Sequence, residues 1–386
     1  MSKLGSVSVH KSACQPINSL ERKEDIHAYE HLQYSPSRGL GRFNNLHFSK
    51  KMAKCLSFTG SADFLYRSFF SYSGLRSVKT EFPDGTTMHC WVPKSHKHSK
   101  PNLLLVHGFG ANAMWQYGEL LHHLMPRFNI YVPDLLFFGE SKTDRPERTE
   151  AFQAQSVMRL MEAHGVHKMS LVGISYGGFV GYSMAAHFPE AVEKVVLCCT
   201  GVCLEEKDLR DGLFEVADLD EAASILMPQT PEKLRELIRF AFARPVMKGV
   251  PTYFLSDYIG VFCTDHVEQK KELIQALIKE RQLSKVPRIE QPTLIIWGEQ
   301  DRIFPLELGH RLEKHIGDNA KLVMIKNAGH AVNIEKPKEF AKNLKIVSDR
   351  FAVVSTTQER VSSTQALPLA KPMTSQLPNK IKINIL

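Results

Sequence analysis

Long hydrophobic runs are missing from this sequence of 386 residues. None reaches the roughly 18 consecutive apolar residues that a membrane-spanning helix needs, so we predict no transmembrane segment. The first 30 residues lack the apolar core of a secretory signal, and four acidic residues among them argue against a transit peptide. We therefore expect a soluble, cytoplasmic protein, with the plastid as the alternative if residues 1–51 are a transit peptide.

Cysteine is present in a number and pattern that argue against a disulfide framework. The seven cysteines are an odd number, and none is spaced with nearby histidines as in a zinc site. Cys198, Cys199 and Cys203 lie in or just after an apolar stretch, where free cysteine behaves as a small hydrophobic residue. We expect a reducing compartment, no disulfides and no bound metal.

The excess of positive charge is concentrated at the two ends of the chain. The net charge is +8, of which residues 1–51 carry +4 and residues 355–386 carry +3, leaving +1 for the body. A nearly neutral body argues against a nucleic-acid-binding face. We predict residues 1–51 to be a disordered extension, with Met52 as an alternative start, and residues 355–386 to be a disordered tail.

From residue 76 onward, strand patterns alternate with helical ones. Residues 76–93 alternate in polarity around the turn Pro83-Asp84-Gly85, which predicts two strands. Further apolar runs have the length of strands buried on both faces of a parallel sheet. These runs are Leu103–Val106, Ile130–Val132, Met169–Val172, Val195–Cys199, Thr293–Trp297 and Leu322–Ile325. The alternation predicts an α/β fold, with a mostly parallel central sheet flanked by helices.

One segment interrupts this alternation. About 90 residues separate two successive strands, where a crossover needs far fewer. The segment has helical patterns, such as Thr230 capping a helix that has Pro231 at its first position. We predict a helical cap, or lid, over residues 204–288, inserted between two parts of the core, 52–203 and 289–354.

The segment Gly173-Ile174-Ser175-Tyr176-Gly177 matches the G-x-S-x-G pattern of a nucleophile on a strand–turn–helix junction. It directly follows an apolar strand and opens a helix. Because such a turn is tight, the residues two before and two after the serine must be nearly free of side chain, as Gly173 and Gly177 are. We predict Ser175 to be a nucleophile; an ordinary serine in a glycine-rich turn is the structural alternative.

A serine nucleophile needs a base, and a histidine base needs an acid that holds its tautomer. His330 follows the last predicted strand, and Asp301 follows the strand before it. The chain order Ser, Asp, His fits a nucleophile on this kind of turn. We predict His330 to be the base and Asp301 the acid. Glu299 competes with Asp301 because it lies two residues nearer the end of the same strand.

Acyl transfer through a serine also needs N–H donors for the oxyanion of the tetrahedral intermediate. The residue after the nucleophile, Tyr176, supplies one N–H. The second is expected from the loop His107-Gly108-Phe109-Gly110, which follows an early strand. We predict the backbone N–H groups of Phe109 and Tyr176 to form the oxyanion hole.

Together these motifs resemble the α/β-hydrolase superfamily, and the resemblance covers about residues 75–353. Within it, the chain is similar to plant members of the capped group that holds meta-cleavage-product hydrolases, monoacylglycerol lipases and epoxide hydrolases. Epoxide hydrolases and haloalkane dehalogenases use an aspartate nucleophile, whereas position 175 is serine. The resemblance therefore implies an α/β-hydrolase fold with a helical cap and argues against those two activities.

The leading functional hypothesis is hydrolysis of the carboxylic ester of a small to medium apolar acyl compound, with no cofactor. Five residues are candidates for the lining of an apolar pocket, with burial in the protein core as the alternative for each: Phe137, Phe138, Phe179, Phe214 and Met227. Cleavage of a C–C bond, as in meta-cleavage hydrolases, is the close alternative that the resemblance permits. Hydroxynitrile lyase or acyltransferase chemistry, or a ligand receptor on the same fold, would also fit these motifs.

Overall fold

The computed structural model of the chain describes residues 57–216, 218–245 and 249–348. All of them belong to one unit, Phe48–Leu386. The predictions of disorder for residues 1–51 and 355–386 lie outside the described residues. No helix in the described ranges is long and apolar enough to cross a membrane.

A single sheet of eight strands organises the described chain, in the order β1-β2-β4-β3-β5-β6-β7-β8. β2 pairs antiparallel with β1 and with β4, and all other neighbours run parallel. The strands are β1 (Leu75–Glu81), β2 (Thr87–Pro93), β3 (Asn102–Val106), β4 (Asn129–Pro133), β5 (Met169–Ile174), β6 (Val192–Cys198), β7 (Thr293–Gly298) and β8 (Ala320–Ile325). This confirms the mostly parallel sheet that the apolar runs predict.

Burial explains the two kinds of strand pattern. Every residue of the central strand β5 is buried, because helices cover both of its faces. The edge strand β1 instead alternates in exposure after Leu75. The tight turn between β1 and β2 places Gly85 at φ +80°, a conformation that suits glycine.

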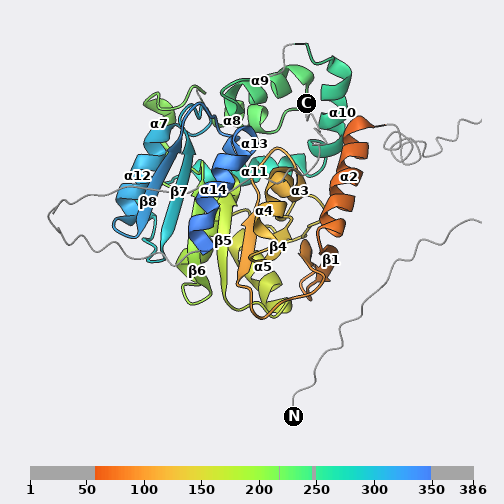
Figure 1. Cartoon of the computed structure of the whole chain (residues 1–386). Helices are drawn as coiled ribbons and strands as arrows, with labels where there is room; N and C mark the ends of the chain where they lie inside the picture. The colour runs from red at the N-terminus through yellow and green to blue at the C-terminus, as the bar shows by residue number, and fades with distance from the viewer. Residues whose placement is uncertain (1–56, 217, 246–248, 349–386) are drawn as a thin grey trace, which may run out of the picture. The chain divides into compact units, whose positions relative to one another are not determined.

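Helices flank the sheet (Figure 1). α6 packs on β5, β6 and α5, α12 packs on β7 and β8, and α14 contacts β6. Outside the segment between β6 and β7, the helices are α2 (Phe58–Tyr72), α3 (Ala113–Tyr117), η1 (Gly118–Leu120), α4 (Leu121–Leu124), α5 (Glu150–Ala163), α6 (Tyr176–His187), α12 (Leu306–Ile316), α13 (Val332–Glu335) and α14 (Pro337–Ser348).

The segment between β6 and β7 is helical in the described residues. It holds α7 (Lys207–Arg210), α8 (Leu219–Leu226), α9 (Pro231–Ala241), α10 (Thr252–Phe262), α11 (Val267–Ile278) and η2 (Leu283–Lys285). Thr230 caps α9 by accepting the N–H of Lys233, as the sequence predicts. Figure 1 shows α8, α9 and α10 gathered beyond one end of the sheet. Tyr258 of α10 donates to the carbonyl of Gly110, and Ala331 donates to the carbonyl of Ala241 at the end of α9, so this is the end where the loops after β3 and β8 lie.

Candidate active site

Ser175 lies on a strained turn between β5 and α6. Its backbone has φ +53° and ψ −119°, which is unusual for a residue with a side chain. A Cβ on Gly173 would lie 2.4 Å from the carbonyl oxygen of Gly177, and one on Gly177 would lie 2.1 Å from that of Val106. Both glycines are therefore required by close backbone contacts, as the G-x-S-x-G pattern predicts.

The three predicted catalytic side chains form one hydrogen-bonded chain. His330 Nε2 lies 2.9 Å from Ser175 Oγ, and His330 Nδ1 lies 2.9 Å from Asp301 Oδ2. The Asp301 side chain is fully buried, and that of His330 is 11% exposed. With Nδ1 protonated toward the carboxylate, Nε2 is free to accept the serine proton.

The hydrogen bonds of Asp301 and Glu299 show which of the two carboxylates faces His330. Asp301 Oδ1 accepts the backbone N–H groups of Ile303 and Phe304, at 2.9 and 2.8 Å, which leaves Oδ2 for the imidazole. Glu299 accepts the N–H of Asn327 at 3.0 Å. The turn after β7 thus aims Asp301, and not Glu299, at His330.

The loop after β3 runs directly alongside the serine. A Cβ on Gly108 would lie 2.9 Å from Ser175 Cβ, so only glycine allows this approach. Gln116 shapes the loop, because its Oε1 accepts the N–H of Gly108 at 2.8 Å and its Nε2 donates to the carbonyl of Gly108 at 2.9 Å. Tyr176 is the first residue of α6, so its N–H has no acceptor within the helix.

Glu335 holds the loop that carries His330. Its carboxylate accepts the N–H of Gly329 at 2.6 Å, and also those of Ala243 and Arg244, at 3.2 and 3.3 Å, just after α9. The sequence analysis missed both Glu335 and Gln116. Glu335 lies only five residues after the predicted histidine, so its closeness to that loop could be read from the sequence. Its partners just after α9 are distant in sequence and could not be.

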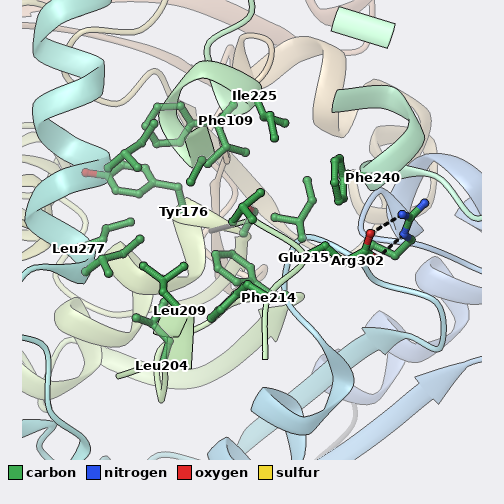
Figure 2. Close-up of a pocket in the computed structure, with 18 of the residues that line it drawn as sticks. Phe109, Tyr176, Leu204, Leu209, Phe214, Glu215, Ile225, Phe240, Leu277 and Arg302 are labelled. Atoms are coloured by element: carbon green, nitrogen blue, oxygen red, sulfur yellow. Dashed lines mark hydrogen bonds and ion pairs between the residues drawn. The ribbon is translucent and has the colours of Figure 1, made fainter. Parts of the chain in front are cut away.

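An apolar pocket of about 850 Å³, part of it open to solvent, ends at Ser175. Figure 2 shows aromatic and aliphatic side chains pointing into it, with the Glu215–Arg302 ion pair on one side. Lining residues from the segment between β6 and β7 include Leu204, Phe214, Ile225, Phe240, Ile274 and Leu277.

Of the five candidates for the pocket lining, two line the cavity and three are buried in the core instead. Phe179 and Phe214 line the cavity, whereas Phe137, Phe138 and Met227 are not among the described residues that do so. Phe138 is buried behind Phe109, at 5.0 Å between ring centroids. Met227 is buried in a small cluster with Ala223 and Ile274, so it lies one layer behind the wall.

Within the described ranges, one group of possible metal donors lies at the site: Cys199, Asp301 and His330, whose donor atoms are within 4.8 Å of one another. Asp301 and His330 are already bonded to each other, so a metal would have to displace that bond. Burial also raises the pKa of the Cys199 thiol, which disfavours the thiolate that binds metals. The arrangement fits proton transfer better than metal binding.

A second chain of Ser, His and Asp side chains lies away from the pocket, where β1, β2 and β4 pair. His89 Nε2 lies 2.8 Å from Ser77 Oγ, and His89 Nδ1 lies 2.8 Å from Asp134 Oδ2. Ser77 is exposed on an edge strand and not on a sharp turn before a helix. The sequence analysis did not identify this chain. This chain provides an internal comparison for Ser175, because it contains the same three residue types but its serine does not lie on a sharp turn between a strand and a helix.

The fold and this geometry define a class of protein. A sequence model of the α/β hydrolase family matches residues 103–343, and the chain belongs to that family. Among its relatives, monoacylglycerol lipase ABHD6 of Bos taurus is 25% identical over 279 residues, covering 69% of this chain and 80% of the relative. Lipase 3 of Moraxella sp. (strain TA144) is 26% identical over 267 residues, covering 64% and 77%.

The solved structures agree on the fold. The 2-hydroxy-6-oxo-6-phenylhexa-2,4-dienoate hydrolase of Rhodococcus sp. strain RHA1 superposes with a TM-score of 0.57 and 22% identity, covering 70% of this chain and 98% of its own. At this level of identity the match supports the fold alone.

Proposed function

We propose that the protein is a serine hydrolase that cleaves carboxylic esters of apolar acyl compounds through an acyl-enzyme on Ser175. The observation that carries this proposal is the hydrogen-bonded chain Ser175–His330–Asp301 ending in an apolar pocket. Both relatives named above are lipases by name, which supports ester hydrolysis as the reaction class.

In the first half-reaction, Ser175 Oγ attacks the ester carbonyl while His330 Nε2 takes the hydroxyl proton. Asp301 keeps the imidazole in the required tautomer and stabilises the imidazolium that forms. When the C–O bond of the ester breaks, His330 gives the proton to the departing alcohol. In the second half-reaction a water molecule attacks the acyl-enzyme with the same base, releasing the acid and free Ser175.

The oxyanion of each tetrahedral intermediate would be held by the N–H groups of Phe109 and Tyr176. Support comes from the close approach of Gly108 to Ser175 and from the place of Tyr176 at the N-terminus of α6. The helix dipole adds a favourable field for the negative charge at that point. Removing one donor from such a hole costs about 10²–10³-fold in kcat in other enzymes.

The pocket favours an apolar acyl chain over a charged one. Its walls are aliphatic and aromatic, and its two charged residues, Glu215 and Arg302, neutralise each other. A carboxylate buried in these walls would have no free cation to pair with among the described lining residues. The similarity to monoacylglycerol lipases makes a glycerol ester with one acyl chain the first natural compound to test.

The test is a series of p-nitrophenyl esters of increasing acyl length, with the wild-type protein and Ser175→Ala. We expect wild-type turnover to rise with chain length to a maximum, because each added methylene buries apolar surface until the pocket is full. Ser175→Ala should reduce turnover by about 10⁶-fold. Equal turnover by both proteins would refute the proposed nucleophile.

A further inference from the structure

Helix α2 exposes a row of large apolar side chains to solvent. Phe58, Leu65, Phe69 and Tyr72 are spaced by 7, 4 and 3 residues, which places them along one stripe of a helix. The exposed fractions of Leu65 and Tyr72 are 66% and 93%, and that of Phe64, beside the stripe, is 68%. A stable surface helix normally presents polar residues to water.

The two charged residues of α2, Asp63 and Arg67, instead contact the body of the protein. Asp63 accepts hydrogen bonds from Asn112 Nδ2 at 2.8 Å and from the Trp115 indole N–H at 3.1 Å. Arg67 donates to Glu140 at 2.8 Å. The helix is therefore attached to the body through these polar contacts and through Phe70, which is fully buried in the core.

Helix α10 extends the same apolar surface. Phe58 packs edge-on against Phe254, with ring centroids 5.4 Å apart, and Tyr253 beside it is 61% exposed. Figure 1 shows α2 and α10 side by side. Of the eight large hydrophobic residues that are exposed in the described ranges, six lie on these two helices. We call these six the apolar face: Phe58, Phe64, Leu65, Phe69, Tyr72 and Tyr253.

A cationic loop adjoins one end of the apolar face. Residues 94–100 read Lys-Ser-His-Lys-His-Ser-Lys and contain no acidic residue. Lys94 connects this loop to the C-terminal end of α2. Its backbone N–H donates to the carbonyl of Gly74, and its Nζ donates to the carbonyl of Ser71 at 2.6 Å. Lys94 and Lys97 are both exposed.

We propose that the apolar face and the loop 94–100 form a docking surface for an anionic lipid bilayer. Exposed Phe, Leu and Tyr side chains on one helix side suit insertion at the boundary between headgroups and acyl chains. The lysines would meet the lipid phosphates, and each basic residue near an anionic surface adds to binding. A second copy of the chain or an apolar protein partner would cover the aromatic residues but gives no role to the adjoining cationic loop.

This surface connects with the proposed active site through one helix. α10 carries Tyr253 in the apolar face, and its Tyr258 hydroxyl donates to the carbonyl of Gly110 at 2.6 Å. Gly110 ends the loop that passes beside Ser175. Docking would thus hold the loop region near the source of an apolar substrate, although the docking proposal does not depend on ester hydrolysis.

The test is co-sedimentation of the full chain with vesicles of phosphatidylcholine alone and of phosphatidylcholine mixed with phosphatidylserine. We expect binding to the mixed vesicles, a loss of at least about tenfold in the double variant Phe64→Ser/Leu65→Ser, and a clear loss in Lys94→Glu/Lys97→Glu. Met324→Ser, which changes a 40% exposed apolar residue on β8, is the matched control and should bind like the wild type.

Three results would overturn the proposal. The first is a folded wild-type chain that binds neither vesicle. The second is unchanged binding by either double variant. The third is a wild-type dimer in light scattering that Phe64→Ser/Leu65→Ser converts to monomer, which would assign the face to a second copy. Fluorophosphonate labelling without vesicles should be equal in all these variants, so a failure of docking is distinguishable from a failure of the proposed hydrolase.

Discussion

The carboxylate of Glu335 accepts the backbone N–H of Gly329 at 2.6 Å, one residue before His330. The same carboxylate accepts two N–H groups just after α9, so the imidazole loop and the segment between β6 and β7 share one anchor. Ala331 adds a direct hydrogen bond to the carbonyl of Ala241 at the end of α9. The orientation of His330 therefore depends on a helix that also carries part of the pocket wall.

Glu335→Ala should lower kcat by about 10–100-fold, because a small displacement of a catalytic group is costly. KM for a p-nitrophenyl ester should change less, since α9 contributes only Phe240 to the described pocket lining. Glu335→Gln keeps one acceptor and should lose less activity. Glu339→Ala, at an exposed position on α14, is the control. A rise in KM alone, with kcat unchanged, would contradict a positioning role for Glu335.

Asp301→Asn should leave the fold intact and slow turnover by about 10⁴-fold, because an amide stabilises the wrong tautomer of His330. Glu299→Gln should have only a mild effect on turnover, since in the described part of the chain the Glu299 carboxylate accepts the N–H of Asn327 and does not contact His330. Steady-state kinetics of the two variants, with circular dichroism as a check on folding, decide the matter. The reverse ranking would move the acid to Glu299.

Phe214→Ala should shift the preferred acyl chain toward greater length, because Phe214 lines the pocket and packs on Phe304 at 6.4 Å between ring centroids. Met227→Ala should instead lower stability by about 2–5 kcal/mol, since Met227 is buried behind the wall. The ester series and urea unfolding measure the two effects. If both variants change acyl preference equally, Met227 also lines the pocket, and its placement behind the wall is wrong.

Burial lowers the pKa of His107 despite the nearby negative charge of Asp134. His107 accepts the N–H of Leu135 at Nε2, and its Nδ1 lies 2.8 Å from the carbonyl of Gly108, so the folded state holds the neutral form. The unfolded chain takes up a proton below about pH 6.5, the ordinary value for histidine. Stability should therefore be full above that pH and fall as the pH drops toward the lowered pKa of the folded state.

Urea unfolding at about pH 7, 6 and 5, values that bracket the ordinary pKa of histidine, measures this loss in the free energy of unfolding. One such group contributes at most about 1.4 kcal/mol per pH unit to the slope. His107→Gln should flatten the slope, while His310→Gln, at an exposed position, should leave it unchanged. An equal slope in all three proteins would show that His107 does not govern acid sensitivity.

The sequence predicted what depends on local spacing. Gly173 and Gly177 are needed within a few residues of Ser175, so the turn is visible as a short motif, and the fully buried strand β5 is visible as an apolar run. The mostly parallel sheet followed from the same alternation of strands and helices, whereas the order of its strands came only from the structure. The sequence favoured Asp301 over Glu299 but did not exclude Glu299, because the choice depends on how the turn after β7 directs each side chain.

What the sequence did not reveal depends on contacts between distant segments. Gln116 is an ordinary glutamine until the fold brings it beside Gly108. Phe137 and Phe138 were candidates for the pocket lining, yet the chain turns at Phe137, with φ +74°, and both rings are buried in the core. The outward-facing apolar side of α2 also requires the structure, since the spacing alone would suggest the buried face.

The central claim is that Ser175 forms the covalent intermediate, and mapping a fluorophosphonate adduct by mass spectrometry tests it most directly. Ser77 makes this a strict comparison, because it also has a His–Asp partner chain but lies exposed on an edge strand. We predict one adduct per chain, on the peptide that contains Ser175, and none in Ser175→Ala. An adduct on Ser77, or full labelling of Ser175→Ala, would contradict the account.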